Sequence, residues 1–227
     1  MGQLDINAIK QLRLAENQYM PEEFKKTQIV IHHTAGGPSP INAITGWNAN
    51  EERVGTAFVI AGKPSSATSN YKDGEIYQCF SSKHWAHHLG LKAVHLTSGG
   101  KSNTALNQGS IGIEVSNWGY LTKAADGTFR TYVNTVVPAD QVYTYTTPFK
   151  GHIYYQKYTA AQIESLRQLL VYLCDKYGIP KTYNADMWDI SKPALKGNPG
   201  IYTHVSYRPD KTDMHPQAEL VNMLKSL

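Results

Sequence analysis

Four short hydrophobic runs in the first 115 residues predict β-strands. They cover residues 27–32, 57–61, 75–80 and 110–115. The first run is rich in β-branched residues and leads into a glycine-containing loop, as a buried strand does. In the last run, isoleucine and valine alternate with Gly112 and Glu114, so the two faces of this strand differ. The sequence Lys-Asp-Gly at 72–74 indicates a hairpin-type turn before the third strand.

The clearest helix covers residues 160–177. Thr159 is a favourable N-cap residue, and Gln162 three positions later completes a capping box. Apolar residues then recur at steps of three and four and form one stripe, which we expect to face the core. Gly178 and Pro180 end the helix. Shorter helices are expected at 41–50 and 217–227.

In two stretches, 120–158 and 181–202, the apolar residues follow neither the helical nor the strand period. The first is rich in Thr, Tyr, Pro and Gly, and the second contains several Pro and Gly residues. Long irregular stretches inside a compact domain are often functional loops, so we expect both to be surface loops or insertions. Strands that alternate with helices predict an α/β fold, with a mixed central sheet flanked by helices.

Composition narrows the class of protein. With 227 residues, 41% hydrophobic content and 18% charged residues, the chain can form one well-buried domain and is not disordered. The formal net charge of +4 comes without a basic cluster, so no nucleic-acid partner is expected. No window approaches the roughly 20 apolar residues of a membrane helix. The N-terminus does not resemble a signal peptide, which leaves the compartment open. We expect a monomer without a membrane partner.

The cysteine count excludes a disulfide scaffold. Cys79 and Cys174 have no CxxC partner, and we expect both to be buried free thiols. A zinc site in this chain would therefore have to use histidines and carboxylates.

His32 closes a buried strand and meets a glycine-rich loop, where a side chain can reach a cleft. A lone histidine at such a place is usually structural. His204 and Asp213 lie nine residues apart in a proline-bounded segment, which could present two ligands to one ion. Two histidines and one aspartate leave a fourth position for water, as in a catalytic zinc site. By itself this spacing is not specific.

Glu114 is the third element of a candidate site. It shares a strand face with Gly112 and Ser116, and it could simply be solvated. However, Gly112 leaves room for a close approach to that face. A carboxylate beside an activated water is the general base that a metal-dependent hydrolase needs.

Seven segments carry a resemblance to a known family. In chain order they are IVIHHTAGG (29–37), VGTAFVI (54–60), DGEIYQCF (73–80), WAHHLG (85–90), NQGSIGIEVSN (107–117), YTAAQIESLRQLL (158–170) and THVSYRPDKTDMHP (203–216). Together they resemble the zinc-dependent N-acetylmuramoyl-L-alanine amidases, whose fold is shared by amidase-type phage endolysins and peptidoglycan recognition proteins. The resemblance spans about residues 28–216, most of the chain.

The resemblance implies roles for five residues. His32, His204 and Asp213 would hold Zn²⁺, with Asp213 in a position where some relatives have cysteine. Glu114 corresponds to a catalytic glutamate, and Lys211 to a lysine over the reacting carbonyl.

Substrate contacts are implied for a second set of residues, which consists of Thr56, His87, Asn107 and Trp118. The chain departs from the family pattern at two of these places. The usual His-Ala-Gly reads His87-His88-Leu89, which weakens a specific role for His87. Thr56 stands where some relatives have a catalytic tyrosine, so catalysis should depend on Glu114 and Lys211.

The implied activity is zinc-dependent hydrolysis of the amide bond between N-acetylmuramic acid and L-alanine in peptidoglycan, as in a bacteriolytic endolysin. Two alternatives stay open: a peptidoglycan-recognition module without turnover, and an amidase for soluble anhydro-muropeptides. We expect residues 1–227 to form a single catalytic domain without a separate wall-binding domain.

Overall fold

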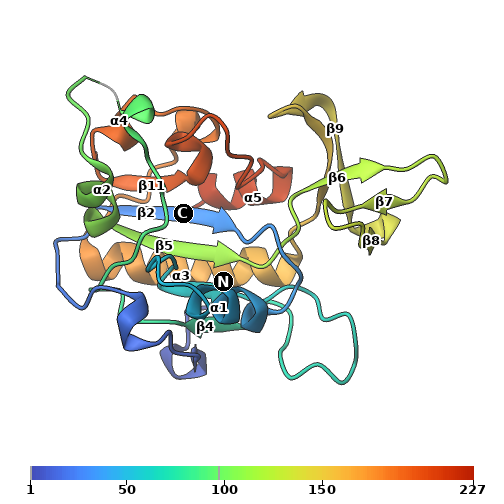
Figure 1. Cartoon of the computed structure of the whole chain (residues 1–227), viewed down its shortest axis with the longest axis horizontal. Helices are drawn as coiled ribbons and strands as arrows, with labels where there is room; N and C mark the ends of the chain where they lie inside the picture. The colour runs from blue at the N-terminus through green and yellow to red at the C-terminus, as the bar shows by residue number, and fades with distance from the viewer. Residues whose placement is uncertain (1, 97) are drawn as a thin grey trace.

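The computed structural model describes residues 2–96 and 98–227 and is built around a six-stranded sheet (Figure 1). The strands lie in the order β1-β4-β3-β5-β2-β11. They are β1 (Lys10–Gln11), β2 (Gln28–His33), β3 (Phe58–Ile60), β4 (Ile76–Gln78), β5 (Ser110–Val115) and β11 (Gly200–Thr203). Strands β3 and β4 are antiparallel and the other neighbours are parallel, so the sheet is mixed.

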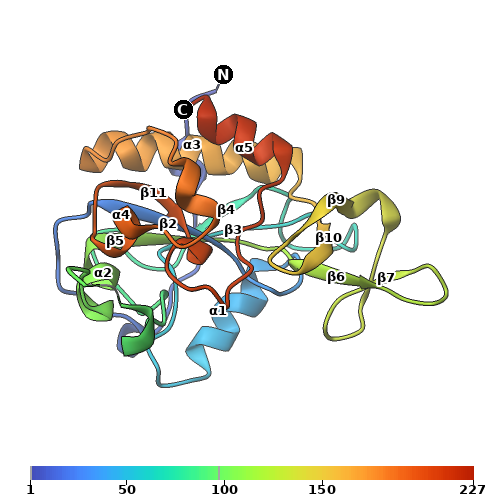
Figure 2. The same ribbon diagram turned by 90° about the horizontal axis from the view of Figure 1, so that it is seen from above.

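Helices cover both faces of this sheet, and the predicted α/β class is confirmed. The α-helices are α1 (Pro40–Asn48), α2 (Asn103–Gly109), α3 (Ala160–Tyr177), α4 (Lys192–Leu195) and α5 (Ala218–Lys225). Figure 2 shows α3 and α5 on one side of the sheet and α1 and α2 on the other. Single turns of 3-10 helix lie at Ile6–Ala8, Glu16–Gln18, Ala93–His95, Ala139–Gln141, Ala185–Trp188 and His204–Ser206.

Strand β2 is buried along its whole length. Ile29 and Ile31 belong to the core cluster that includes the buried leucines of α3 and α5. Val30 belongs to a second cluster, together with Leu106 of α2. Burial on both faces explains why residues 29–31 of this strand are all apolar. Because side chains alternate along a strand, the following residues His32 and His33 point to opposite faces.

Helix α3 has the predicted bounds and capping. The backbone N–H of Gln162 donates to Thr159 Oγ1 at 3.0 Å, and the N–H of Thr159 donates to Gln162 Oε1 at 3.1 Å. Gly178 ends the helix with a φ of 65°, a left-handed conformation that favours glycine. The helix packs its leucine stripe against the sheet, as the spacing predicts.

The prediction of an irregular loop for 120–158 is wrong. This stretch forms a second, antiparallel sheet in the order β8-β7-β6-β10-β9, which projects to the right in Figure 1. Its strands are β6 (Tyr120–Lys123), β7 (Phe129–Arg130), β8 (Val136–Val137), β9 (Val142–Phe149) and β10 (His152–Gln156). In β9, Thr144, Thr146, Thr147 and Pro148 are exposed, while Tyr143, Tyr145 and Phe149 are half-buried. The half-buried face consists mainly of tyrosines, which have a polar hydroxyl, so the alternation of apolar and polar residues is weak in the sequence.

The stretch 181–202 is also more regular than predicted. It contains a 3-10 turn, helix α4 and the start of β11, which pairs with β2. Strand β11 has four residues and a partner about 170 positions away, so local sequence gives little sign of it. Helix α2 is likewise absent from the sequence prediction. The expected strands and the helices at 41–50 and 217–227 are present with bounds shifted by a few residues.

Cys79 and Cys174 are buried free thiols, as predicted. Among the described residues, no helix has the length and apolar character needed to cross a membrane.

Candidate metal centre and active site

The candidate residues meet at the carboxyl edge of the central sheet. Strands β2, β5 and β11 are parallel neighbours in register, so their carboxyl ends lie side by side. His32 near the end of β2 is the direct cross-strand partner of Glu114 on β5. His204 follows the last residue of β11. In open α/β sheets, this edge is where ligands usually bind.

Asp213 stands between the two histidines. Its Oδ2 lies 3.2 Å from His32 Nδ1 and 3.0 Å from His204 Nδ1. The ligand atoms of the three residues all lie within 4.8 Å of one another, and all three side chains are buried or nearly so. Two ligands of a tetrahedral zinc stand about 3.3 Å apart when each is about 2.0–2.1 Å from the ion. The donor types and their separations therefore fit Zn²⁺.

The charge states also suit a metal site. Burial, aided by the neighbouring His204, lowers the pKa of His32 to about 4, so His32 is a neutral imidazole with a free lone pair. Burial alone would raise the pKa of Asp213. The hydrogen bonds of His204 and His32, and the positive charges that these rings carry when protonated at low pH, outweigh burial and hold that pKa well below its usual range. Neutral histidines and an ionised aspartate are the forms that bind a cation.

Glu114 is an acid without a hydrogen-bond partner. Its Oε2 is buried and makes no hydrogen bond to the described residues. Burial raises its pKa well above the usual range, and the charge of Asp213 adds to this, while Lys211 opposes it. A buried polar atom left unpaired is uncommon in a folded protein and often has a functional reason.

From the sequence, Gly112 was expected to leave room for another group to approach its strand face, and the structure identifies the groups that do so. A Cβ atom at Gly112 would lie 2.7 Å from Thr56 Cγ2 and 3.3 Å from His88 Cγ. The glycine therefore admits two side chains of the protein itself onto the face that carries Glu114.

A cavity of about 450 Å³ opens over this edge. Its lining includes the three candidate ligands, Glu114, Lys211, Thr56 and His87. Thr56 is buried, and its hydroxyl donates to the Phe58 carbonyl at 2.9 Å. Burial, together with Arg53, lowers the pKa of His87, which lies edge-on to the Trp85 ring.

Asn107 and Trp118 do not line this cavity. Asn107 is fully buried, and its Oδ1 accepts hydrogen bonds from the backbone N–H groups of His88 and Leu89 at 2.9 and 3.2 Å. Trp118 packs with the core of the second sheet and meets the Tyr132 ring edge to face. Both residues lie near the site and support its surroundings.

Two residues of the cavity were missed by the sequence interpretation. His88 Nδ1 lies 3.0 Å from His32 Nε2, and Arg208 lines the cavity near Lys211. The only sign of His88 was the second histidine in WAHHLG. His33 points away from the ligands, as strand alternation requires, and its Nδ1 lies 2.9 Å from the Tyr158 hydroxyl.

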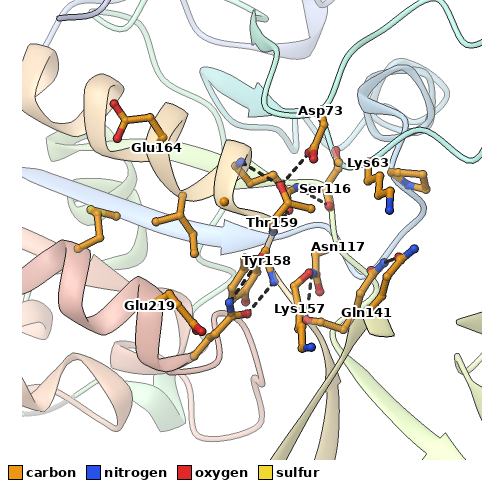
Figure 3. Close-up of a pocket in the computed structure, with 18 of the residues that line it drawn as sticks. Lys63, Asp73, Ser116, Asn117, Gln141, Lys157, Tyr158, Thr159, Glu164 and Glu219 are labelled. Carbon is orange, nitrogen blue, oxygen red and sulfur yellow. Dashed lines mark hydrogen bonds between the residues drawn. The ribbon is translucent and has the colours of Figure 1, made fainter. Parts of the chain in front are cut away.

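A larger cavity, of about 860 Å³, lies at the N-terminus of α3 (Figure 3). Charged side chains of both signs stand around it, including Lys63, Asp73, Glu164 and Glu219. Its buried amide side chains bond to the backbone, namely Asn117 to Gln156 and Lys157, Gln162 to Ser116 and Thr159, and Gln217 to Tyr158. In the described part of the chain, the one group of side chains arranged to hold a metal is in the smaller cavity.

Comparison with known proteins agrees with this geometry. The family model of N-acetylmuramoyl-L-alanine amidases matches residues 24–216. The solution structure of the PlyG catalytic domain superposes with a TM-score of 0.52 at 14% identity, over 96% of this chain and 93% of that one. A selenomethionine derivative of AmpD gives 0.50 at 19% identity over 98% and 99% of the two chains. PlyL gives 0.50 at 13% identity over 96% of each chain.

At these identities the structural likeness concerns the fold, and the family match carries the assignment. No curated protein sequence is significantly similar to this chain. The matched residues, 24–216, cover most of the chain and include the metal-ligand set and Glu114. The chain therefore belongs to the family of N-acetylmuramoyl-L-alanine amidases and is an amide hydrolase of that class.

Proposed function

We propose that the protein uses Zn²⁺ to hydrolyse the amide bond between the lactyl group of N-acetylmuramic acid and L-alanine in peptidoglycan. One observation carries this proposal. A buried His-His-Asp set lies beside Glu114, the cross-strand partner of His32, and the buried Oε2 of Glu114 has no hydrogen-bond partner among the described residues. This arrangement supports metal-assisted hydrolysis, and membership of the amidase family supplies the substrate.

His32, His204 and Asp213 would hold the ion through Nδ1, Nδ1 and Oδ2. When bound, zinc lowers the pKa of a water ligand to about 7 and polarises a carbonyl group. Three protein ligands would leave a fourth coordination position for water, as in catalytic zinc sites.

Glu114 would act as the general base. It is the cross-strand neighbour of His32 and lines the same cavity, so it can take a proton from the attacking water. The same carboxyl group would then deliver this proton to the nitrogen of the leaving L-alanine. Beside a bound dication the carboxyl group would begin ionised, and its buried setting would help it keep the proton between the two steps.

Lys211 would stabilise the negative charge that develops on the carbonyl oxygen. It lines the cavity two residues before Asp213, so its ammonium group can reach a substrate held there. Thr56 cannot substitute as an acid or base, because its hydroxyl donates to a backbone carbonyl. His87 is the candidate for contact with the bound substrate.

We also propose that residues 1–227 act as one catalytic unit, with the second sheet as an extension of it. In Figure 1 this sheet rises from the edge at which β2 and β5 end. Tyr132 from the β7–β8 turn donates a hydrogen bond to Ala35 O at 3.0 Å, and Ala35 lines the metal-site cavity. The second sheet is therefore placed to border an extended substrate.

Digestion of purified peptidoglycan by the zinc-loaded protein tests the reaction. Mass spectrometry of the products should show stem peptides that begin with a free L-alanine, and chelation should stop their release. New reducing sugar ends would instead indicate a glycosidase. Wall binding without any product, indifferent to chelator, would indicate a recognition module. A parallel assay with soluble anhydro-muropeptides determines which of the two substrate forms is preferred.

A further inference from the structure

The two histidines of the metal centre use their ring nitrogens in the same way. Each presents Nδ1 to Asp213 and keeps Nε2 for a second partner. His32 Nε2 lies 3.0 Å from His88 Nδ1, and His204 Nε2 lies 3.0 Å from the Leu89 carbonyl oxygen. Both second partners therefore come from two consecutive residues of one loop.

Metal binding through Nδ1 would fix the positions of the ring protons. A histidine that binds a metal through Nδ1 carries its proton on Nε2, and this N–H needs an acceptor. For His204 the acceptor is a backbone carbonyl, which can only accept. For His32 it is His88 Nδ1, so His88 must carry its own proton on Nε2.

The chain of hydrogen bonds continues in the same direction. His88 Nε2 donates to Ser110 Oγ at 2.9 Å, and the Ser110 hydroxyl donates to the Leu106 carbonyl at 2.7 Å. A backbone carbonyl ends the chain, so no donor in it is left without an acceptor. The ring of His88 stands edge-on to that of His32, at 5.2 Å between centroids and 83° between planes.

The loop that provides both partners is itself fixed. Asn107 Oδ1 accepts from the backbone N–H groups of His88 and Leu89, and Asn107 Nδ2 donates to the Asn103 carbonyl at 2.7 Å. The absence of a side chain at Gly112 leaves the space that the His88 ring fills. Helix α2 and the start of β5 thus hold the His88–Leu89 segment against the metal ligands.

We propose that His88 is a positioning residue, which holds the His32 ring with Nδ1 directed at the metal, while the Leu89 carbonyl does the same for His204. The proposal rests on the zinc site of the proposed function. It predicts that the two histidines respond differently to substitution. The orientation of His32 depends on the His88 side chain, which a substitution can remove, whereas the orientation of His204 depends on a backbone carbonyl.

Zinc affinity provides the first test. Competition titration against a chromophoric chelator should show that His88→Ala binds zinc about 10- to 100-fold more weakly than the unmodified protein, as is usual when a metal-ligating histidine loses its acceptor. His88→Asn places an amide oxygen near the position of Nδ1 and should recover part of this loss, whereas His88→Leu should not. His152→Ala, which removes a histidine stacked on Tyr120 in the second sheet, is the control for folding and should leave the affinity unchanged.

The ring protons provide a second test, which needs no variant. In ¹⁵N NMR spectra of the zinc-loaded protein, His32 should bear its proton on Nε2 and couple to His88, and both histidine ligands should bind through Nδ1. Binding of zinc through Nε2 of His32, or equal zinc affinity of the His88→Ala, His88→Leu and unmodified proteins, would overturn the role of His88 and leave the zinc site intact. Failure of the unmodified protein to bind zinc would refute the metal site and, with it, the proposed function.

Discussion

The two large cavities of this protein differ in what their buried polar groups do. The cavity at the N-terminus of α3 is about 860 Å³, nearly twice the 450 Å³ of the metal-site cavity. In the larger one, the buried amides of Asn117, Gln162 and Gln217 are bonded to backbone groups (Figure 3). In the smaller one, Glu114 has an unpaired oxygen and two histidines share one carboxylate oxygen. The chemistry of the lining, and not its volume, distinguishes the candidate active site.

This difference has an energetic meaning. A satisfied buried amide contributes to folding, whereas an unpaired buried carboxyl group opposes it and is retained for another reason. Substitutions in the larger cavity should therefore lower stability and preserve turnover. Substitutions in the smaller cavity should remove turnover at little cost in stability.

The largest effect is expected from removal of a metal ligand. His32→Ala leaves two of the three ligands, so the purified protein should contain no stoichiometric zinc, and turnover of peptidoglycan should fall to background. Metal analysis after dialysis and product release measure the two effects on one sample. The matched control is His33→Ala, because His33 lies on the opposite face of β2 and bonds to Tyr158. This control should keep its zinc, and loss of zinc from both variants would contradict the assignment of ligands by face.

Glu114→Gln is expected to have the next largest effect. The amide keeps the size of the side chain but cannot take a proton, so kcat should fall by about 10²- to 10⁴-fold. Zinc content should remain stoichiometric, since the three ligands are untouched. Rates measured at saturating peptidoglycan check this, and full activity of the variant would exclude Glu114 as the base.

Lys211→Met should reduce kcat by about 10²- to 10³-fold, the usual effect of removing one group that stabilises a developing oxyanion. The apolar side chain keeps the length of the stem without the charge. Arg208→Met is the matched control, because Arg208 lines the same cavity but is paired with Asp210 and Gly90. A larger loss in the Arg208 variant than in the Lys211 variant would transfer the proposed role to Arg208.

Residue types and spacing made His32, His204 and Asp213 candidate ligands, and the resemblance to the amidase family gave them that role. His32 ends a recognisable strand, and the spacing of His204 and Asp213 suggested a shared ion, so the structure brings together what the sequence had selected. The contact of His88 with His32 was not predicted, because His88 lies in a segment without regular structure. In such a segment, no alternation rule indicates which of two consecutive histidines faces a cleft. Asn107 lies in one of the seven segments that resemble the family. The sequence did not indicate whether its side chain contacts substrate or, as the structure shows, bonds to the backbone of His88 and Leu89.

The fold was predictable where one face of an element is buried and the other is not. Helix α3 satisfies this condition, and its capping box and leucine stripe fix both its ends and its orientation. The second sheet satisfies it only weakly, because four of the eight residues of β9 are exposed, only Val142 is buried, and β7 and β8 have two residues each. Its pairing depends on contacts between strands, which the hydrophobic pattern of a single segment does not encode.

In the larger cavity, Gln162→Met should act on stability alone. Gln162 donates to the Ser116 carbonyl at 2.8 Å and accepts from the N–H of Thr159, and both backbone groups would lose their partner. The free energy of unfolding should fall by about 1–3 kcal/mol. Chemical denaturation measures this, and kcat should be unchanged at a temperature where the variant is folded. A fall in kcat without a change in stability would mean that the larger cavity takes part in catalysis.

The most gradual effect concerns the pH dependence of stability in the metal-free protein. Burial raises the pKa of Glu114 well above the ordinary value of 4.5, so between these two values the folded protein holds a proton that the unfolded chain has lost. Stability of the unmodified protein should therefore fall, relative to Glu114→Gln, as the pH rises above about 4.5, by at most about 1.4 kcal/mol per pH unit. The pKa of Asp213 lies well below 3.8 in the folded protein, so Asp213 is ionised above pH 4.5 in both proteins and adds no slope there. Urea denaturation of the two metal-free proteins across this range measures the effect.

Zinc should remove the slope, because a nearby dication favours the ionised carboxylate. Parallel stability curves for the two proteins would show that Glu114 titrates normally, and the contrast between the two cavities would then rest on the metal ligands alone.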